Sequence, residues 1–260
     1  MIGALIGGLG ELAKRPLLAI PALLGMAINT MVLLFAIDNY FSFFFGVFFL
    51  GEVPNVSIEQ LPFYMLSAYW VDIVVMSLAV FVSLFVSLFV LYTYAALVTK
   101  KEKGIVRAIT SQFPRAGEIF SFTLFAFIAA FLYTVVAFLL FIGTISLEGI
   151  GIVVFILLLA WLLFGFYVFL KFTFAPLFMA IGKKKLKAAL AQSWKWSSKR
   201  IVEIIVLLVA LALVSGFISL VFSLVADAVS IDEIAVLALI IGASLSNAYY
   251  NIVLVKYFEG

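Results

Sequence analysis

Six long apolar segments divide this sequence, and each has the length needed to cross a lipid bilayer. They lie at residues 17–37, 70–98, 119–142, 150–170, 201–226 and 234–255. A membrane-crossing helix needs about 20 predominantly apolar residues. Apolar residues make up 67% of the chain and charged residues 11%, whereas soluble domains are roughly half apolar and about a quarter charged. We therefore predict an all-α integral membrane protein in which residues 1–260 form a single transmembrane domain, a six-transmembrane helix bundle.

For two apolar stretches outside these spans, the sequence does not decide between alternative structures. The Phe-rich residues 41–50 are too few to cross a membrane, so they either lie at the interface or extend the first span. Residues 2–13 place apolar side chains at helical spacing, which is typical of a helix lying flat on a membrane surface. Glycines within this stretch weaken that prediction because they lower helix propensity.

Every basic residue falls at one end of the predicted bundle. The predicted outer loops carry acidic residues and no basic ones: Asp38, Glu52, Glu59, Glu148, Asp227, Asp232 and Glu233. The lysines and arginines fall near the two termini and around the other two loops, at residues 99–118 and 171–200. Basic residues that flank spans are retained on the cytoplasmic side. The sequence therefore predicts both termini in the cytoplasm (N-in/C-in) and a multi-pass protein of the cell membrane.

The most distinctive polar segment is residues 182–200, where basic residues alternate with an apolar stripe. Leu186, Leu190 and Trp194 share one face of a predicted helix. This pattern predicts a cytoplasmic interfacial amphipathic helix that binds anionic lipid head groups. Alternatively, the basic cluster serves only to orient the protein in the membrane. We expect no nucleic acid as a partner. The candidate head-group residues are Lys183, Lys184, Lys185, Lys187, Lys195, Lys199, Arg200 and Trp194.

The same region carries a resemblance to known families. Phe172-Thr173-Phe174-Ala175-Pro176-Leu177, a glycine-containing turn and then Ala188-Ala189-Leu190-Ala191-Gln192-Ser193-Trp194 form an aromatic-Ala-Pro and A-L-x-x-S-W pattern. About residues 165–225 thereby resemble poorly characterised prokaryotic multi-span families. These include the membrane domain of some glycerophosphodiester phosphodiesterases and the YciC-like proteins. The resemblance implies a membrane-embedded helical bundle and brings no catalytic residue, because the phosphodiesterase domain is not in this sequence.

Polar residues inside the predicted spans are the remaining candidates. Such residues face the interior of a bundle, where they either hold helices together or line a polar path. We expect Asp72 to lie near the outer head groups as a solvated carboxylate beside an aromatic belt. The serines and asparagines we assign mainly to helix packing, with a polar path as the alternative. The set comprises Asn29, Asp72, Ser83, Ser215, Ser219, Ser223, Ser244, Asn247 and Asn251.

A faint internal repeat also links the two basic loops. Residues 93–98 parallel residues 173–178, and each run leads into a basic cluster. The spacing of apolar residues after each cluster is similar as well. Duplicated hairpins and chance likeness between two apolar hairpins both explain this pattern, and repeats are common in transporter folds.

Several chemistries are excluded by composition. The chain has no cysteine and no histidine, so thiol catalysis, histidine acid–base catalysis and the usual zinc ligands cannot occur. We expect no cofactor, no metal site and no enzymatic activity. The favoured function is a non-catalytic membrane protein that organises lipids or a partner complex, with a membrane protein or a second copy of the chain as possible partners. A small permease or channel is the alternative, and a membrane-embedded lipid enzyme is third.

Overall fold

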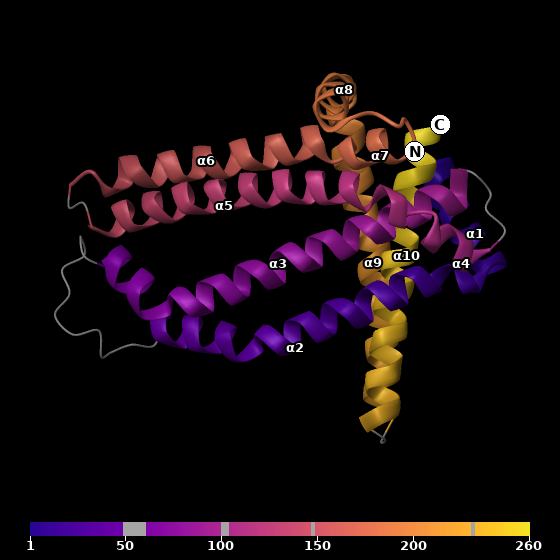
Figure 1. The fold of residues 1–260 in the computed structure, drawn as a ribbon, viewed down its shortest axis with the longest axis horizontal. Coiled ribbons are helices and arrows are strands. Elements are labelled where there is room, and N and C mark those ends of the chain that lie inside the picture. Colours follow the sequence, from indigo (N-terminus) through magenta and orange to yellow (C-terminus); the bar gives the residue numbers. More distant parts are fainter. Residues whose placement is uncertain (49–60, 100–103, 147–148, 230–231) are drawn as a thin grey trace. The chain divides into compact units, whose positions relative to one another are not determined.

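A computed structural model gives the fold for residues 1–48, 61–99, 104–146, 149–229 and 232–260. Within these ranges every regular element is helical (Figure 1), which confirms the all-α prediction. The elements in chain order are α1 (Ile2–Lys14), η1 (Pro16–Ala19), α2 (Ile20–Phe48), α3 (Leu61–Thr99), α4 (Ile105–Thr110), η2 (Phe113–Arg115), α5 (Ala116–Ser146), α6 (Gly151–Phe172), α7 (Ala175–Ala180), α8 (Leu186–Lys199), α9 (Ile201–Ala228) and α10 (Asp232–Glu259).

Six helical stretches in the described ranges are long and apolar enough to cross a membrane. They correspond to the six predicted spans, and their apolar side chains point largely outward. Phe35 is 76% exposed and Ile152 is 73% exposed. Exposed apolar surface of this extent would make a soluble protein aggregate, but it suits contact with lipid tails. The membrane character predicted from composition is therefore visible in the side-chain distribution.

The observed helices extend beyond the predicted spans. The helix that holds the first span, α2, continues to Phe48, so the described residues 38–48 extend that helix instead of forming a separate segment. No proline interrupts the sequence between Ile37 and Phe48, and helix-breaking residues are what normally end such a segment. The second long helix, α3, begins at Leu61 and contains a kink at Tyr69, whose φ of −119° and ψ of 21° are not helical.

The helices divide into two compact units, which we describe separately. The first unit comprises residues 1–27, 86–122 and 166–260, and the second comprises residues 28–85 and 123–165. The second unit contains no lysine or arginine. All basic residues of the chain belong to the first unit, where the short helices α1, α4, α7 and α8 also lie.

Within the first unit, α9 and α10 run side by side, and α1 packs along α10 (Figure 1). Gly8 of α1 lies so close to α10 that a Cβ atom there would collide with the side chain of Val253. Lys256 Nζ donates to Gly7 O and to Glu11 Oε2, both at 3.1 Å. The glycines that weakened the helix prediction for residues 2–13 thus include one whose missing side chain allows α1 to approach α10.

Within the second unit, aromatic and polar side chains join neighbouring helices. Trp161 of α6 donates its Nε1 proton to Tyr133 O of α5 at 3.1 Å, and the two rings stack with centroids 5.4 Å apart. A Cβ atom at Gly165 would collide with the Tyr133 ring. Phe81 of α3 meets Phe127 of α5 edge to face, with centroids 5.6 Å apart. These contacts show close packing inside a unit that lacks charge except at Asp38 and Asp72 among its described residues.

Candidate functional site

The chain enters α8 through a tight turn after α7. A Cβ atom at Gly182 would lie 2.7 Å from Phe178 O, so only glycine fits without moving the backbone. Lys183 adopts a positive φ of 49°, which is uncommon for a residue other than glycine. The backbone N–H of Lys184 then donates to Phe178 O at 3.3 Å. This turn separates two helices that pack against each other, α7 and α8.

A stripe of small residues on α8 packs on the protein. Ala189, Ser193 and Ser197 recur every four residues and are buried, so they form one stripe along the helix. Ser193 Oγ donates to Lys171 O in the last turn of α6 at 2.7 Å. Small side chains allow close approach between helices. The inward stripe of α8 lies directly beside the predicted stripe of Leu186, Leu190 and Trp194, each of which precedes one of its members by three positions.

The outward face of α8 and the preceding turn carry the predicted head-group residues. Leu186 and Leu190 are half-buried, and Trp194 is 38% exposed. Arg200 is half-buried, with its guanidinium 4.8 Å above the ring of Trp196. The predicted lysines are all exposed: Lys183, Lys184, Lys185, Lys187, Lys195 and Lys199. We call these lysines, Arg200 and Trp194 the basic surface. No acidic residue occurs between Gly182 and Arg200, so this surface has no internal charge compensation.

An aromatic cluster supports the basic surface from the protein side. Phe174 is fully buried, and its ring centroid lies 4.8 Å from that of Trp196 and 5.8 Å from that of Tyr257. Phe258 of α10 packs on Phe178 of α7 edge to face at 4.7 Å. Aromatic pairs in these geometries add about 0.5–1.5 kcal/mol each beyond burial of their area. The cluster therefore holds α7, α8 and the end of α10 together.

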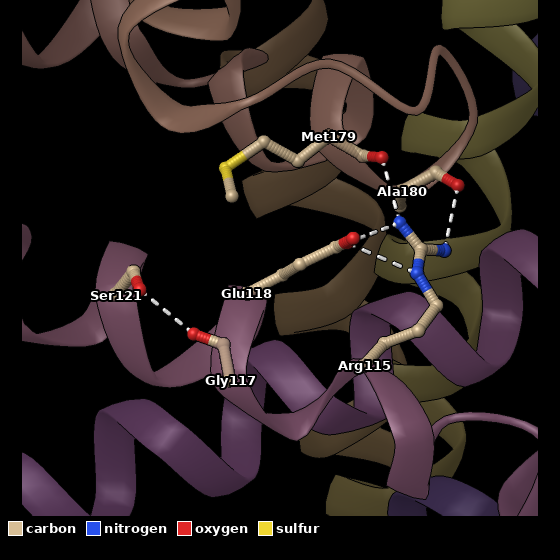
Figure 2. A network of polar contacts seen from close by, with 6 residues as sticks. All are labelled: Arg115, Gly117, Glu118, Ser121, Met179 and Ala180. Atoms are coloured by element: carbon tan, nitrogen blue, oxygen red, sulfur yellow. Dashed lines mark hydrogen bonds and ion pairs between the residues drawn. The ribbon is translucent and has the colours of Figure 1, made fainter.

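Arg115 lies at the centre of a network of polar contacts in the first unit (Figure 2). Its Nη1 donates to Ala180 O at 2.8 Å and its Nη2 to Met179 O at 2.7 Å. Its Nε and Nη2 also reach Glu118 Oε2, at 3.0 and 2.7 Å. The last carbonyls of a helix have no partner inside the helix, so Arg115 caps α7 from a distant part of the chain.

From its sequence position, Arg115 is only one of the basic residues on the predicted cytoplasmic side. One signal pointed to a structural role. Arg115 immediately precedes α5, and a cation at a helix N-terminus opposes the helix dipole. An arginine in that place needs another source of stabilisation, which here comes from the α7 carbonyls and from Tyr92, whose ring centroid lies 4.8 Å from the guanidinium carbon.

The polar stripes of α9 and α10 meet at a residue that the sequence analysis did not select. Ser246 of α10 donates to Ser215 O at 2.9 Å, and its Oγ lies 3.2 Å from Ser219 Oγ. Asn251 donates to Asn247 O at 2.8 Å within α10. Polar side chains therefore link α9 and α10 at Ser246. The two asparagines instead bond to each other along one helix.

The other polar candidates within the spans differ in their hydrogen bonding and burial. Ser244 donates to Ile240 O at 2.7 Å within α10, with Met26 Sδ at 3.4 Å. Asn29 Oδ1 and Ser215 Oγ are buried without a hydrogen-bond partner in the described part of the chain. Ser83 and Ser223 are half-buried.

Replacing Ser246 with alanine should destabilise the α9–α10 pair. Interhelical hydrogen bonds in membrane proteins contribute about 0.6 kcal/mol on average and at most about 1.7 kcal/mol. We expect a loss in this range in the free energy of unfolding, measured by equilibrium unfolding in mixed micelles. Ser223→Ala on α9 is the control, because Ser223 makes no hydrogen bond to another described residue. Equal losses in the two variants would contradict a specific bond at Ser246.

Asp72 lies in a polar contact within the second unit. Its Oδ1 accepts from Asn39 Nδ2 at 2.7 Å and its Oδ2 from Ser42 Oγ at 3.0 Å. The side chain is half-buried, and Asn39 and Ser42 both belong to α2. The sequence led us to expect a solvated carboxylate at Asp72, and it did not predict these two hydrogen-bond partners. Asp72 thus ties α3 to α2 just after the kink at Tyr69.

No group of three or more potential metal-ligating side chains occurs among the described residues. A comparison with protein-family models finds no match, and comparisons with curated proteins and with solved structures find none either. The basic surface on α8, built from exposed cations on a helix anchored by buried small and aromatic residues, is therefore the strongest candidate for a functional site.

Proposed function

We propose that this protein is a non-catalytic integral membrane protein that gathers anionic lipids at its cytoplasmic surface. The observation that carries the proposal is the division of α8 into two faces. Its small residues pack on the protein, the lysines of the basic surface are exposed, and the half-buried Leu186 and Leu190 lie at the border between these two faces. The fold leaves this side of α8 free for a membrane surface, and its chemistry suits negatively charged head groups.

The magnitude of the attraction is adequate for lipid selection. A lysine or arginine close to an anionic membrane surface contributes about 1 kcal/mol. The basic surface holds Lys183, Lys184, Lys185, Lys187, Lys195, Lys199 and Arg200, with no acidic residue among them. Several of these contacts together favour anionic over zwitterionic lipid strongly enough to enrich it next to α8.

The proposal requires the basic surface to face the cytoplasm. The distribution of charge supports that orientation: residues 28–85 and 123–165 contain no basic residue, and both termini belong to the basic first unit. Because basic flanks are retained in the cytoplasm, we propose a cell-membrane protein with both termini and α8 on the cytoplasmic side.

Single cysteines should report this orientation directly, since the chain has none of its own. Asp227 and Lys185 are both exposed. In intact cells, Asp227→Cys should react with an impermeant thiol reagent, whereas Lys185→Cys should react only after the membrane is permeabilised. Labelling of Lys185→Cys from outside would contradict the orientation. Asp227→Cys in permeabilised cells serves as the control for reagent activity.

The lipid function is tested by extraction in a lipid-preserving polymer and mass spectrometry of the lipids that co-purify. The wild type should hold anionic lipids in excess over their share of the membrane. Lys184→Gln combined with Lys187→Gln should reduce this excess about tenfold, as expected for loss of two contacts of about 1 kcal/mol each with partial compensation by neighbours.

The matched control removes two other exposed charges of the first unit. Lys14→Gln combined with Arg15→Gln changes the net charge equally but leaves the basic surface intact. This variant should retain most of the enrichment. If both variants lose it equally, or if the wild type shows none, lipid gathering by α8 is wrong. Co-purification of one protein in constant ratio, with unselected lipids, would favour a partner-organising function instead.

A small permease is the second candidate, and one observation favours it. Asn29 Oδ1 is buried in a span without a partner in the described residues, and such groups are costly in lipid unless they face a polar path. Asn29→Cys should then react with small hydrophilic thiol reagents. Absence of this reaction, with stability lowered by Asn29→Leu, would assign the residue to packing.

A further inference from the structure

Lys171 is a buried cation at the end of an apolar helix. It lies in the last turn of α6 and is 3% exposed. Its Nζ donates to Ser198 Oγ of α8 at 2.8 Å. The ammonium also lies 4.8 Å from the ring centroid of Tyr167 and 5.6 Å from that of Trp194. Two aromatic faces and one hydroxyl thus surround the charge.

No carboxylate of the described part of the chain forms an ion pair with Lys171. Glu203, at the start of α9, instead accepts a hydrogen bond from Tyr257 at 2.9 Å. An ammonium has three N–H donors, and Ser198 takes one of them. Buried charges are normally paired, because removing an ion from water is costly. Lys171 therefore has the capacity to bind an anion.

The side chains that contact this ammonium are themselves exposed. Tyr167 is 40% exposed and Trp194 is 38% exposed, and Ser198 is exposed as well. Lys195 and Lys199, which follow Trp194 and Ser198 in α8, are exposed and raise the local positive potential that attracts an anion.

We propose that Lys171 is the centre of a phosphate-binding site, in which its ammonium donates to a phosphate oxygen between Trp194 and Ser198. The inference rests on the proposed lipid function, because the favoured source of this phosphate is the head group of an anionic glycerophospholipid. Tyr167 and Trp194 belong at the boundary between head groups and acyl chains, where amphipathic rings are most stable. A free phosphate ion has the same chemistry and is the other source.

The first test is a titration of the delipidated full-length protein, followed by native mass spectrometry. The probes are palmitoyl-oleoyl phosphatidylglycerol, the matching phosphatidylcholine, and inorganic phosphate as competitor. Lys171→Met should weaken the tightest phosphatidylglycerol site about tenfold, whereas Lys14→Met, which removes an exposed lysine of α1 outside the basic surface, should change it less than about twofold. Lys171→Arg should retain the site.

Competition by inorganic phosphate separates the two sources. No displacement at millimolar phosphate, with weaker binding of phosphatidylcholine, identifies a lipid head-group site. Displacement by phosphate that depends on Lys171 identifies a site for the free ion. Unchanged phosphatidylglycerol binding in Lys171→Met overturns the proposal, since the lysine is then satisfied by the rings and Ser198 alone.

A second variant keeps the test decisive if Lys171→Met does not fold. Ser198→Asp places a carboxylate at an exposed position within reach of the ammonium. We expect this variant to be more heat-stable than the wild type without lipid, and to lose the stabilisation that phosphatidylglycerol provides. If phosphatidylglycerol stabilises both proteins equally, Lys171 is not the phosphate site. Failure here while Lys184→Gln/Lys187→Gln still loses enrichment would leave the proposed lipid function intact.

Discussion

Replacing Gly242 with alanine is expected to destabilise the protein by about 1–3 kcal/mol, the usual cost of overpacking a close contact. Gly242 lies in α10 against α9. A Cβ atom there would collide with Phe222 Cβ and lie 2.6 Å from its Cγ. These atoms sit next to the backbone, so a rotation of the Phe222 side chain cannot remove the collision. The two helices would have to move apart along a buried contact.

The matched control for Gly242→Ala is Gly216→Ala in α9. No atom lies within 4 Å of a Cβ built at Gly216, and alanine is intrinsically the better helix former by about 1 kcal/mol. Gly216→Ala should therefore be neutral or slightly stabilising. Equilibrium unfolding in mixed micelles measures both variants. A Gly242→Ala protein as stable as the wild type would show that α9 and α10 are not packed this closely.

Replacing Arg115 with alanine should cost about 2–3 kcal/mol, because hydrogen bonds from a charged donor contribute about 1.5–3 kcal/mol and this side chain makes several. The loss would leave Met179 O and Ala180 O of α7 without their donor. It would also remove the cation above the Tyr92 ring. The expected result is lower thermal stability in detergent, together with earlier proteolysis near the turn that follows α7.

Two substitutions separate the helix cap from the ion pair. Glu118→Gln removes the charge opposite Arg115 but leaves the α7 carbonyls bonded, and exposed ion pairs contribute at most about 1 kcal/mol. Arg115→Lys keeps the charge but loses the planar fork that reaches two carbonyls at once. We expect Arg115→Lys to cost more than Glu118→Gln. The reverse order would mean that the ion pair, and not the cap, is the important contact.

The location of the helices could be predicted from local sequence patterns. The predicted spans and the observed helices differ only at their ends. Apolar segments as long as residues 201–226 can only be satisfied as helices in a membrane, because each backbone polar group must bond within its own segment. The observed α9, Ile201–Ala228, matches that prediction closely. The extension of α2 to Phe48 was left open, because hydrophobicity alone does not distinguish a long helix from a helix followed by an interfacial segment.

Residue partners could not be predicted in the same way. Ser219 and Ser215 were selected by their spacing, but their partner Ser246 was not, because no periodicity within α10 shows which of its serines faces α9. The stripe of Leu186, Leu190 and Trp194 was evident in the sequence. The neighbouring stripe of Ala189, Ser193 and Ser197, which anchors the helix, was not, because small residues have no strong hydrophobic signal.

The sequence by itself determined that this protein is helical, that it has six apolar helices long enough to cross a membrane, and that its basic residues are separated along the sequence from the loops that carry only acidic residues. These properties depend on composition and on spacing along the chain. Only the tertiary structure decided that Arg115 caps α7, that Gly242 admits Phe222, and that Lys171 lies buried beneath α8. Such contacts join residues up to tens of positions apart, and their energies depend on distances that exist only after the helices have packed.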